Sequence, residues 1–265
     1  MKSVFVTING SYHFGYFYAI ILMKISLSGD IYFMDNKQNL MDKMNCDIAI
    51  IFDFNGTCIF DRTLHNKAWQ TYIEELTLTE VSDEDVSLRI QDKTGKEILE
   101  SFLGYELNDN MVFQLSEEKE RIYRALLIRE DLQLAPGLED FLNFILLARV
   151  KRCIATTANL ENMNLYFERY NLERWFKWEE VIIGAGNIPL KPHPDLYLAA
   201  VSKLDMPTDR ILVFENSTAG VKAAAAAGIN HIIGITGDSH NRSLMNHPGV
   251  MAVVNNYTEL SSIEI

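Results

Sequence analysis

Two acidic residues, a threonine and a lysine stand where apolar runs of this sequence end. Asp53 follows "IAIIF", Thr156 follows "CIA", and Glu215 follows "RILVF". Lys191 lies in the short polar stretch "LKPHPD". An aspartate at the end of such an apolar run is either a helix N-cap or a nucleophile, and a polar residue that ends a parallel strand is well placed for chemistry. Each residue alone has an ordinary explanation, because helix N-caps, polar strand ends and solvated lysines are common.

The elements that must position these residues alternate along the chain from residue 47 onward. Continuous apolar runs, typical of strands buried on both faces, occupy 48–54, 151–157, 179–185, 210–216 and 231–236. Amphipathic stretches typical of helices lie between them, at 138–149, 161–172, 193–204 and 218–229. This alternation predicts an α/β fold, with a Rossmann-like three-layer α/β/α core around a parallel sheet. The carboxyl ends of parallel strands share one edge, where ligands bind, so the four residues are expected to converge there.

One stretch interrupts the alternation. Residues 63–135 contain helical patterns and no comparable strand run, which predicts a helical cap inserted after the first core strand. The predicted domains are therefore a core of residues 47–62 and 136–265, a cap of residues 63–135, and an N-terminal extension of residues 1–46 with unknown role.

The extension carries the apolar stretch "YFYAIILM" at 16–23. This stretch is shorter than the roughly 20 residues that a membrane span needs. The extension also lacks the basic start and the small-residue cleavage site of a signal peptide. An upstream start codon, with Met41 or Met44 as the natural beginning, is the alternative explanation. We expect the extension to contribute nothing to the site.

The four motifs together resemble those of the haloacid dehalogenase superfamily of phosphohydrolases. That family carries D-x-D-G-T, then a Ser or Thr after an apolar strand, a Lys in K-P-x-P, and a pair of acids in F-E-D-S-x-x-G. This chain has "DFNGT", "IATTAN", "LKPHPD" and "FENSTAGVKAAAAAG" in the same order. "HNKAW", from His65 to Trp69, and "APG" at 135–137 are similar to features of the β-phosphoglucomutase-like group, whose helical cap follows the first motif.

The resemblance implies a Mg²⁺-dependent phosphatase. Asp53 would be the nucleophile that forms an aspartyl-phosphate, Thr156 would hold phosphate oxygens, and Lys191 would pair with phosphate and nucleophile together. The residues that the resemblance places in the catalytic site are Asp53, Asn55, Thr156 and Lys191. Mg²⁺ prefers oxygen ligands, and the predicted set is Asp53, the main-chain carbonyl of Asn55, Glu215 and Asn216.

A small phosphorylated metabolite, such as a sugar phosphate, is the expected substrate, because a helical cap closes better over a small ligand than over a protein. The predicted substrate-binding residues come from the first two motifs and the cap: Gly56, Thr57, His65, Lys93, Lys96, Thr157 and Asn159. Lys93 and Lys96 lie in "QDKTGKEILESFLG", which resembles the cap loop of the group. Exposed lysines at a helix N-terminus are the alternative explanation for this pair.

Two family acids are asparagines here, Asn55 and Asn216. A neutral amide cannot transfer the proton that the usual aspartate at position 55 transfers, and such catalysis is worth roughly 10²- to 10⁴-fold. Good leaving groups, or a substitute acid such as His65, would still permit turnover. The alternatives are an impaired relative that binds a phosphorylated ligand or partner, and a phosphomutase, against which Asn55 argues. Glu215 and the retained "NGT" argue against a dehalogenase, which needs no metal.

The overall composition narrows the partners and the compartment. A formal net charge of −12 and a pI near 5 repel phosphate backbones and anionic membranes, so neither nucleic acid nor a membrane is an expected partner. The three cysteines, Cys46, Cys58 and Cys153, share no metal-type spacing and are expected to be free thiols in a reducing compartment, the cytoplasm. A monomer is the favoured oligomeric state.

Overall fold

The computed structural model describes residues 48–90, 93–184, 188–237 and 242–263. These residues divide into two compact units. Unit 1 comprises the described parts of Met1–Cys58, Leu134–Asn159 and Leu172–Ile265, and unit 2 comprises those of Ile59–Gln133 and Leu160–Asn171. The predicted extension, 1–46, lies outside the described residues.

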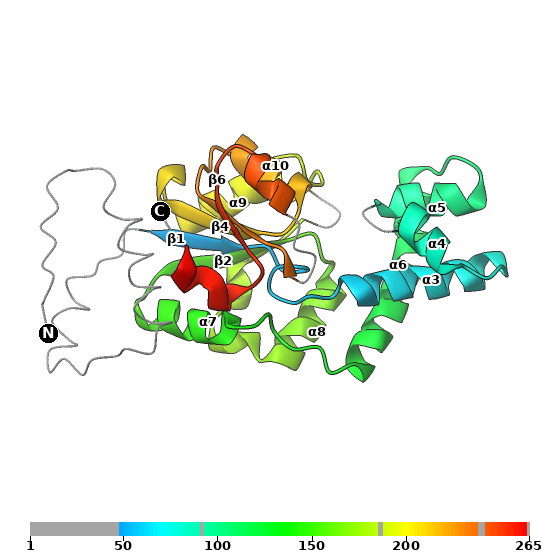
Figure 1. The fold of residues 1–265 in the computed structure, drawn as a ribbon, viewed down its shortest axis with the longest axis horizontal. Coiled ribbons are helices and arrows are strands. Elements are labelled where there is room, and N and C mark those ends of the chain that lie inside the picture. Colours follow the sequence, from blue (N-terminus) through cyan, green and yellow to red (C-terminus); the bar gives the residue numbers. More distant parts are fainter. Residues whose placement is uncertain (1–47, 91–92, 185–187, 238–241, 264–265) are drawn as a thin grey trace, which may run out of the picture. The chain divides into compact units, whose positions relative to one another are not determined.

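Among the described residues, unit 1 is built on a parallel sheet of six strands in the order β3-β2-β1-β4-β5-β6 (Figure 1). The strands are β1 (Ala49–Phe52), β2 (Lys151–Thr156), β3 (Val181–Ile183), β4 (Ile211–Glu215), β5 (Ile232–Ile235) and β6 (Val250–Val254). Every residue of β1, β4 and β5 is buried, which explains the continuous apolar runs in the sequence. β6, a short edge strand that is only partly buried, was not predicted from the sequence.

Helices cover both faces of this sheet. The described helical segments of unit 1 are α7 (Leu138–Leu147), α9 (Asp195–Leu204), α10 (Thr218–Ala226) and the 3-10 segments η2 (Leu172–Arg174), η3 (Trp178–Glu180), η4 (Thr208–Arg210), η6 (Arg242–Asn246) and η7 (Tyr257–Ser262). α9 and α10 pack against the face that carries Ile51. Phe52 points to the opposite face, stacks on Phe214 at 5.3 Å between ring centroids, and contacts Phe141 of α7 and Tyr257 of η7. The predicted three-layer α/β/α core is confirmed (Figure 1).

Unit 2 is helical throughout its described elements. They are α3 (Arg62–Thr77), α4 (Asp83–Asp85), the π-helical η1 (Val86–Ile90), α5 (Gly95–Leu103), α6 (Asp109–Arg129) and α8 (Leu160–Tyr170). Its apolar core joins Trp69 and Ile73 of α3 to Ile98 and Leu99 of α5. The insert between β1 and α7 is therefore helical, as the sequence predicts. None of the helices within the described ranges combines the length and apolar character needed to cross a membrane.

α8 belongs to unit 2, whereas the predicted boundaries assign it to the core. The Asn162 amide donates to Glu120 Oε2 (2.7 Å), and its Oδ1 accepts from Arg124 Nη1 (2.9 Å). The Tyr166 hydroxyl donates to the Tyr123 hydroxyl (2.9 Å). These polar contacts to α6 explain the difference, because the amphipathic pattern of a helix does not reveal which element it packs against.

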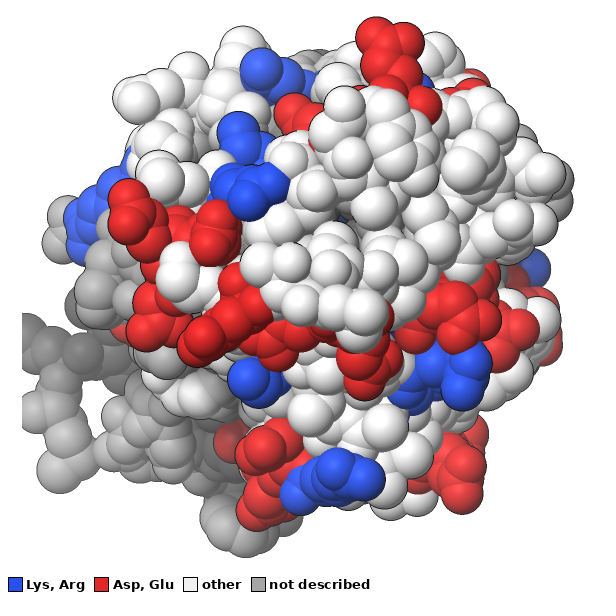
Figure 2. Space-filling view, turned by 90° about the vertical axis from the view of Figure 1, so that its right-hand side faces the viewer, with Lys and Arg blue, Asp and Glu red and all other residues white. Residues whose placement is uncertain are grey.

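Figure 2 shows acidic side chains in a band beneath a broad uncharged surface, with scattered basic side chains. The acidic band agrees with the net charge of −12. On the described part of this face, the basic side chains form no continuous patch of the kind that binds nucleic acid.

Candidate active site

The register of the parallel strands places two acidic side chains level at the carboxyl edge of the sheet. Phe52 of β1 pairs with Phe214 of β4, so the next residues, Asp53 and Glu215, lie side by side. The Asp53 amide donates to the Phe214 carbonyl (3.0 Å), which extends this register by one residue. β2 also ends at this edge, at Thr156. Parallel α/β sheets bind ligands at this edge.

Lys191 bridges the two carboxylates. Its Nζ lies 2.6 Å from Asp53 Oδ1 and 2.5 Å from Glu215 Oε1. The side chains of Lys191 and Asp53 are 8% exposed, and that of Glu215 is 0% exposed. An ammonium group carries three N–H donors, so the third can serve a further acceptor, such as a phosphate oxygen.

Glu215 is held by the protein through both of its carboxylate oxygens. Oε1 accepts from Lys191 and from the Tyr197 hydroxyl (2.9 Å). Oε2 accepts from the Ser217 amide (2.8 Å) and the Ser217 hydroxyl (3.1 Å). A carboxylate has about four lone-pair positions, and these four hydrogen bonds occupy them. Direct metal ligation by Glu215 would therefore require one of the four bonds to break.

The contacts of Tyr197 and Ser217 with Glu215 were not predicted from the sequence. Ser217 has a sequence signal, because a serine just before a helix is a favoured N-cap, and its hydroxyl accepts from the Gly220 amide of α10 (3.0 Å). Tyr197 has no such signal, because its place in α9 predicts only a buried face.

The cluster carries a surplus of negative charge. Burial raises the pKa of the Asp53 carboxyl to about 7, the charge of Glu215 adds to this effect, and Lys191 and Thr57 oppose it. Burial disfavours the charged ammonium of Lys191, but Asp53 and Glu215 outweigh burial and raise its pKa above the usual value. When both carboxylates are ionised, they and the one ammonium sum to one negative charge, which an added cation would neutralise.

The turn after β1 supports the Asp53 side chain. The Thr57 hydroxyl donates to Asp53 Oδ2 (2.9 Å), and the Cys58 thiol donates to the Asp53 carbonyl (3.2 Å). Gly56 has a φ of 77°, in the left-handed region that glycine tolerates. A Cβ at this position would lie 1.8 Å from Asn216 Nδ2, so the Asn216 side chain packs directly on the turn. The half-buried Asn216 thus lies beside Gly56, the residue that follows the half-buried Asn55.

The second motif ends in a local turn. Thr156 is buried, and its Oγ1 accepts from the Ala158 amide (3.0 Å). Thr157 is exposed and Asn159 is half-buried. The structure therefore places Thr156 at the edge of the sheet, with its hydroxyl proton available for another acceptor.

His65 is engaged at both ring nitrogens within unit 2. Lys119 Nζ lies 3.0 Å from His65 Nδ1, and His65 Nε2 lies 3.2 Å from Asp61 Oδ2. An ammonium group can only donate, so Nδ1 accepts in this contact and Nε2 faces Asp61. The ring also stacks on Tyr123 at 3.9 Å. Both ring nitrogens thus already have partners in unit 2, so this arrangement does not favour His65 as a substitute acid.

The two predicted cap lysines contact their own helical surroundings. Lys96 Nζ lies 3.8 Å from Asp109 Oδ1 and 3.9 Å from Glu100 Oε1. Lys93 is exposed, and its amide donates to the Ile90 carbonyl (3.2 Å). These contacts agree with the alternative explanation of exposed lysines near a helix start. Their substrate-binding role stays a prediction.

The donor set suits a hard divalent cation only in part. Within the described ranges, no three His, Cys, Asp or Glu side chains are grouped as a metal site. The oxygen donors near the cluster are the Asp53 carboxylate, the main chain at Asn55 and the Asn216 amide, so water and the phosphate of a substrate must complete the shell. The surplus negative charge of the cluster favours such a cation.

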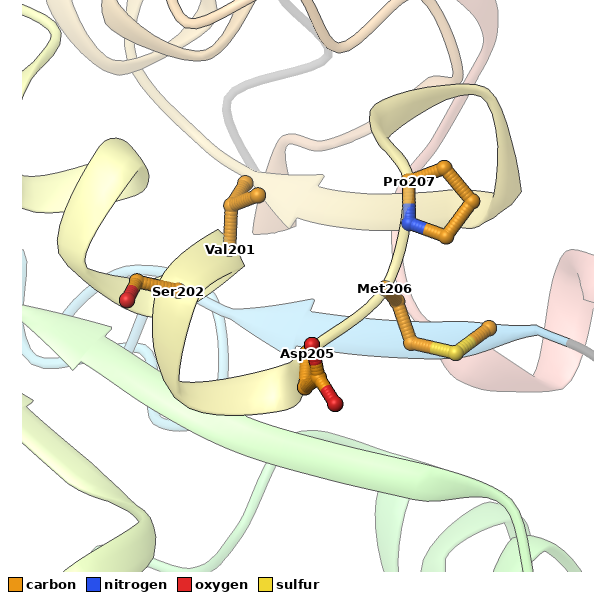
Figure 3. A pocket seen from close by; sticks show the side chains of 5 residues that line it. All are labelled: Val201, Ser202, Asp205, Met206 and Pro207. Atoms are coloured by element: carbon orange, nitrogen blue, oxygen red, sulfur yellow. The ribbon is translucent and has the colours of Figure 1, made fainter.

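A separate cavity of about 290 Å³ lies away from this cluster (Figure 3). It is lined by Val201, Ser202, Asp205, Met206 and Pro207. These residues form the end of α9 and the turn before β4, so the cavity is at the amino edge of the sheet, opposite the carboxylates. It contains no predicted site residue.

The fold and the buried cluster define a class: α/β proteins with a lysine-bridged pair of carboxylates at the carboxyl edge of a parallel sheet. Residues 50–233 match the family of haloacid dehalogenase-like hydrolases, and this chain belongs to that family. The predicted resemblance is confirmed, and curated relatives of this chain are named as phosphatases, which supports the hydrolysis of phosphate monoesters as its reaction class.

Relatives and solved structures agree with this assignment. The chain is 29% identical over 210 residues to the phosphorylated carbohydrates phosphatase of Thermotoga maritima, covering 78% of this chain and 93% of that protein. It is 27% identical to Protein CbbY of Cereibacter sphaeroides, covering 70% and 83%. A crystal structure of a hydrolase of this family from Entamoeba histolytica, family IA variant 3, superposes with a TM-score of 0.75 at 30% identity, covering 82% of this chain and 96% of that one.

Proposed function

We propose that this chain is a Mg²⁺-dependent phosphatase of small phosphorylated carbohydrates that works through an aspartyl-phosphate on Asp53. The contact between Lys191 Nζ and Asp53 Oδ1, 2.6 Å in a buried site, is the observation that carries the proposal. The relatives support the substrate class: one is a phosphatase of phosphorylated carbohydrates, and a CbbY crystal structure contains xylulose-1,5-bisphosphate. The free buried thiols Cys58 and Cys153 fit a reducing compartment such as the cytoplasm.

The chain's own residues divide the work in this proposal. An Asp53 carboxylate oxygen attacks phosphorus and the substrate oxygen leaves, and water then cleaves the aspartyl-phosphate and releases inorganic phosphate. Lys191 neutralises the repulsion between carboxylate and phosphate, and its third N–H binds a phosphate oxygen. Thr156 donates its hydroxyl to another phosphate oxygen.

The cation would be held by the Asp53 carboxylate, the main-chain carbonyl of Asn55 and the Asn216 amide oxygen. Glu215 would contribute its charge and its hold on Lys191. When bound, a divalent cation neutralises negative charge on the phosphoryl group during its transfer. Because Asn216 is neutral, this donor set has fewer negative charges than the family pattern, so the affinity for Mg²⁺ is expected to be low.

Asn216→Asp is expected to lower the dissociation constant for Mg²⁺ by about tenfold, because it adds a charged oxygen ligand beside the turn that carries Gly56. Isothermal titration of the protein with MgCl₂ measures this constant directly. Asn230→Asp is the matched control, because it adds the same charge at an exposed position before β5, at the amino edge. Equal dissociation constants for Mg²⁺ in both variants would show that the metal does not bind at Asn216.

Release of inorganic phosphate from a panel of sugar phosphates, acetyl phosphate and p-nitrophenyl phosphate tests the proposed function. Turnover with MgCl₂ that EDTA abolishes is the expected result. The second candidate is a relative that binds a phosphorylated ligand without turnover, which the neutral amides at Asn55 and Asn216 favour. Binding of the same sugar phosphates, with no phosphate release from any compound, would support that candidate.

A further inference from the structure

Tyr197 contacts both partners of the pair formed by Lys191 and Glu215. Its hydroxyl donates to Glu215 Oε1 (2.9 Å), the same oxygen that Lys191 contacts. Lys191 Nζ also lies over the tyrosine ring, 5.3 Å from its centroid. Tyr197 is fully buried in the apolar cluster between α9 and the sheet, so its position is fixed by packing.

Two carboxylates compete for one ammonium group in this site. Asp53 and Glu215 both contact Lys191, and only contact with Asp53 brings the positive charge to the attacking oxygen. The Tyr197 hydroxyl supplies Glu215 Oε1 with a second hydrogen-bond donor, so this oxygen depends less on Lys191 to stabilise its negative charge. Without this donor, Glu215 Oε1 would have Lys191 as its one remaining donor among the described residues, and the ammonium would orient towards Glu215 at the expense of its contact with Asp53.

We propose that Tyr197 is a positioning residue that keeps the Lys191 ammonium on Asp53 during phosphoryl transfer. This inference rests on the proposed phosphatase function. The alternative is that Tyr197 only fills the core between α9 and the sheet. Phenylalanine would fill the same space without the hydroxyl, so Tyr197→Phe separates the two explanations.

Tyr197→Phe is expected to lower kcat for p-nitrophenyl phosphate by about tenfold or more, because misplacing a catalytic group by a fraction of an ångström to one ångström carries a cost of this order or larger. KM should stay within about twofold, because the loss falls on the transition state. Tyr170→Phe is the matched control: it removes a hydroxyl that donates to the Leu132 carbonyl (3.1 Å) in unit 2. We expect a similar small decrease in Tm for both variants and an unchanged kcat for the control.

A second measurement shows whether Tyr197 acts through Lys191. In a Lys191→Met background, adding Tyr197→Phe is expected to change kcat by less than about twofold, because the group that it positions is gone. Full additivity of the two effects would overturn the proposal, and so would a folded Tyr197→Phe variant with wild-type kcat. If the wild type releases no phosphate, both the proposed phosphatase function and this inference are wrong. If the wild type is active and Tyr197→Phe leaves kcat unchanged, only the inference is wrong.

Discussion

Replacing Asp53 with asparagine is expected to reduce phosphate release by about 10⁴-fold or more, because the change removes the nucleophile and with it the covalent path. The neighbouring carboxylate is poorly placed to replace Asp53 as the nucleophile. Glu215, the neighbouring carboxylate, already accepts four hydrogen bonds from the protein and is fully buried. The expected loss applies to good and poor leaving groups alike, since both react with the same carboxylate.

The measurement is phosphate release from acetyl phosphate and p-nitrophenyl phosphate at saturating MgCl₂, with wild type and variant compared at equal concentration. Asp209→Asn is the matched control, because it makes the same chemical change on an exposed side chain at the amino edge of the sheet. Asp53→Asn should keep its fold, because Lys191 retains its contact with Glu215. Residual turnover near the wild-type level in a folded variant would exclude Asp53 as the nucleophile.

The positions of the two carboxylates could be predicted from the sequence, because the carboxyl ends of parallel strands lie at the same edge of a sheet. Asp53 and Glu215 each terminate a continuous apolar run, and the register between β1 and β4 then leaves little freedom for their separation. Lys191 was predicted from its motif alone, since no periodicity places a loop residue. Its contact with both carboxylates depends on how that loop returns to the sheet, and only the structure gives this path.

Other parts of the site depend on contacts that the sequence does not encode locally. The sequence predicts only that Tyr197 is a buried residue of an amphipathic helix. Its hydrogen bond to Glu215 depends on how α9 packs on the sheet. His65 reads as a possible acid, because histidine often has that role. Its partner Lys119 lies 54 residues further along the chain, and that contact occupies Nδ1 with a donor.

The balance of charge links these observations to the two asparagines. Burial raises the pKa of Asp53 to about 7, and the cluster of Asp53, Glu215 and Lys191 carries one surplus negative charge when Asp53 is ionised. A further aspartate at position 55 or 216 would increase this surplus in the absence of a cation. In the proposed mechanism, the asparagines would therefore reduce the need for a cation, and weaker metal binding and the lack of a proton donor are the expected consequences.

Asn55→Asp is expected to raise turnover of alkyl phosphates by about 10²-fold or more, because it restores a carboxylic acid that can protonate a leaving alkoxide. Activated phosphates such as acetyl phosphate should gain little, because their leaving groups depart without protonation. The comparison between the two classes of leaving group is therefore the informative measurement. Steady-state phosphate release from a sugar phosphate and from acetyl phosphate, at several MgCl₂ concentrations, provides it.

Asn230→Asp again serves as the control, because an added charge at the amino edge should change neither class. If Asn55→Asp leaves both classes equally slow at saturating MgCl₂, the missing acid is not the limit, and metal binding at Asn216 or the cap becomes the cause. If the wild type already hydrolyses alkyl phosphates as fast as the variant, another group supplies the proton. His65→Ala would then identify or eliminate His65, whose contacts with Lys119 and Asp61 argue that it will be eliminated. A selective gain on alkyl phosphates would establish that Asn55 restricts the enzyme to phosphates with good leaving groups.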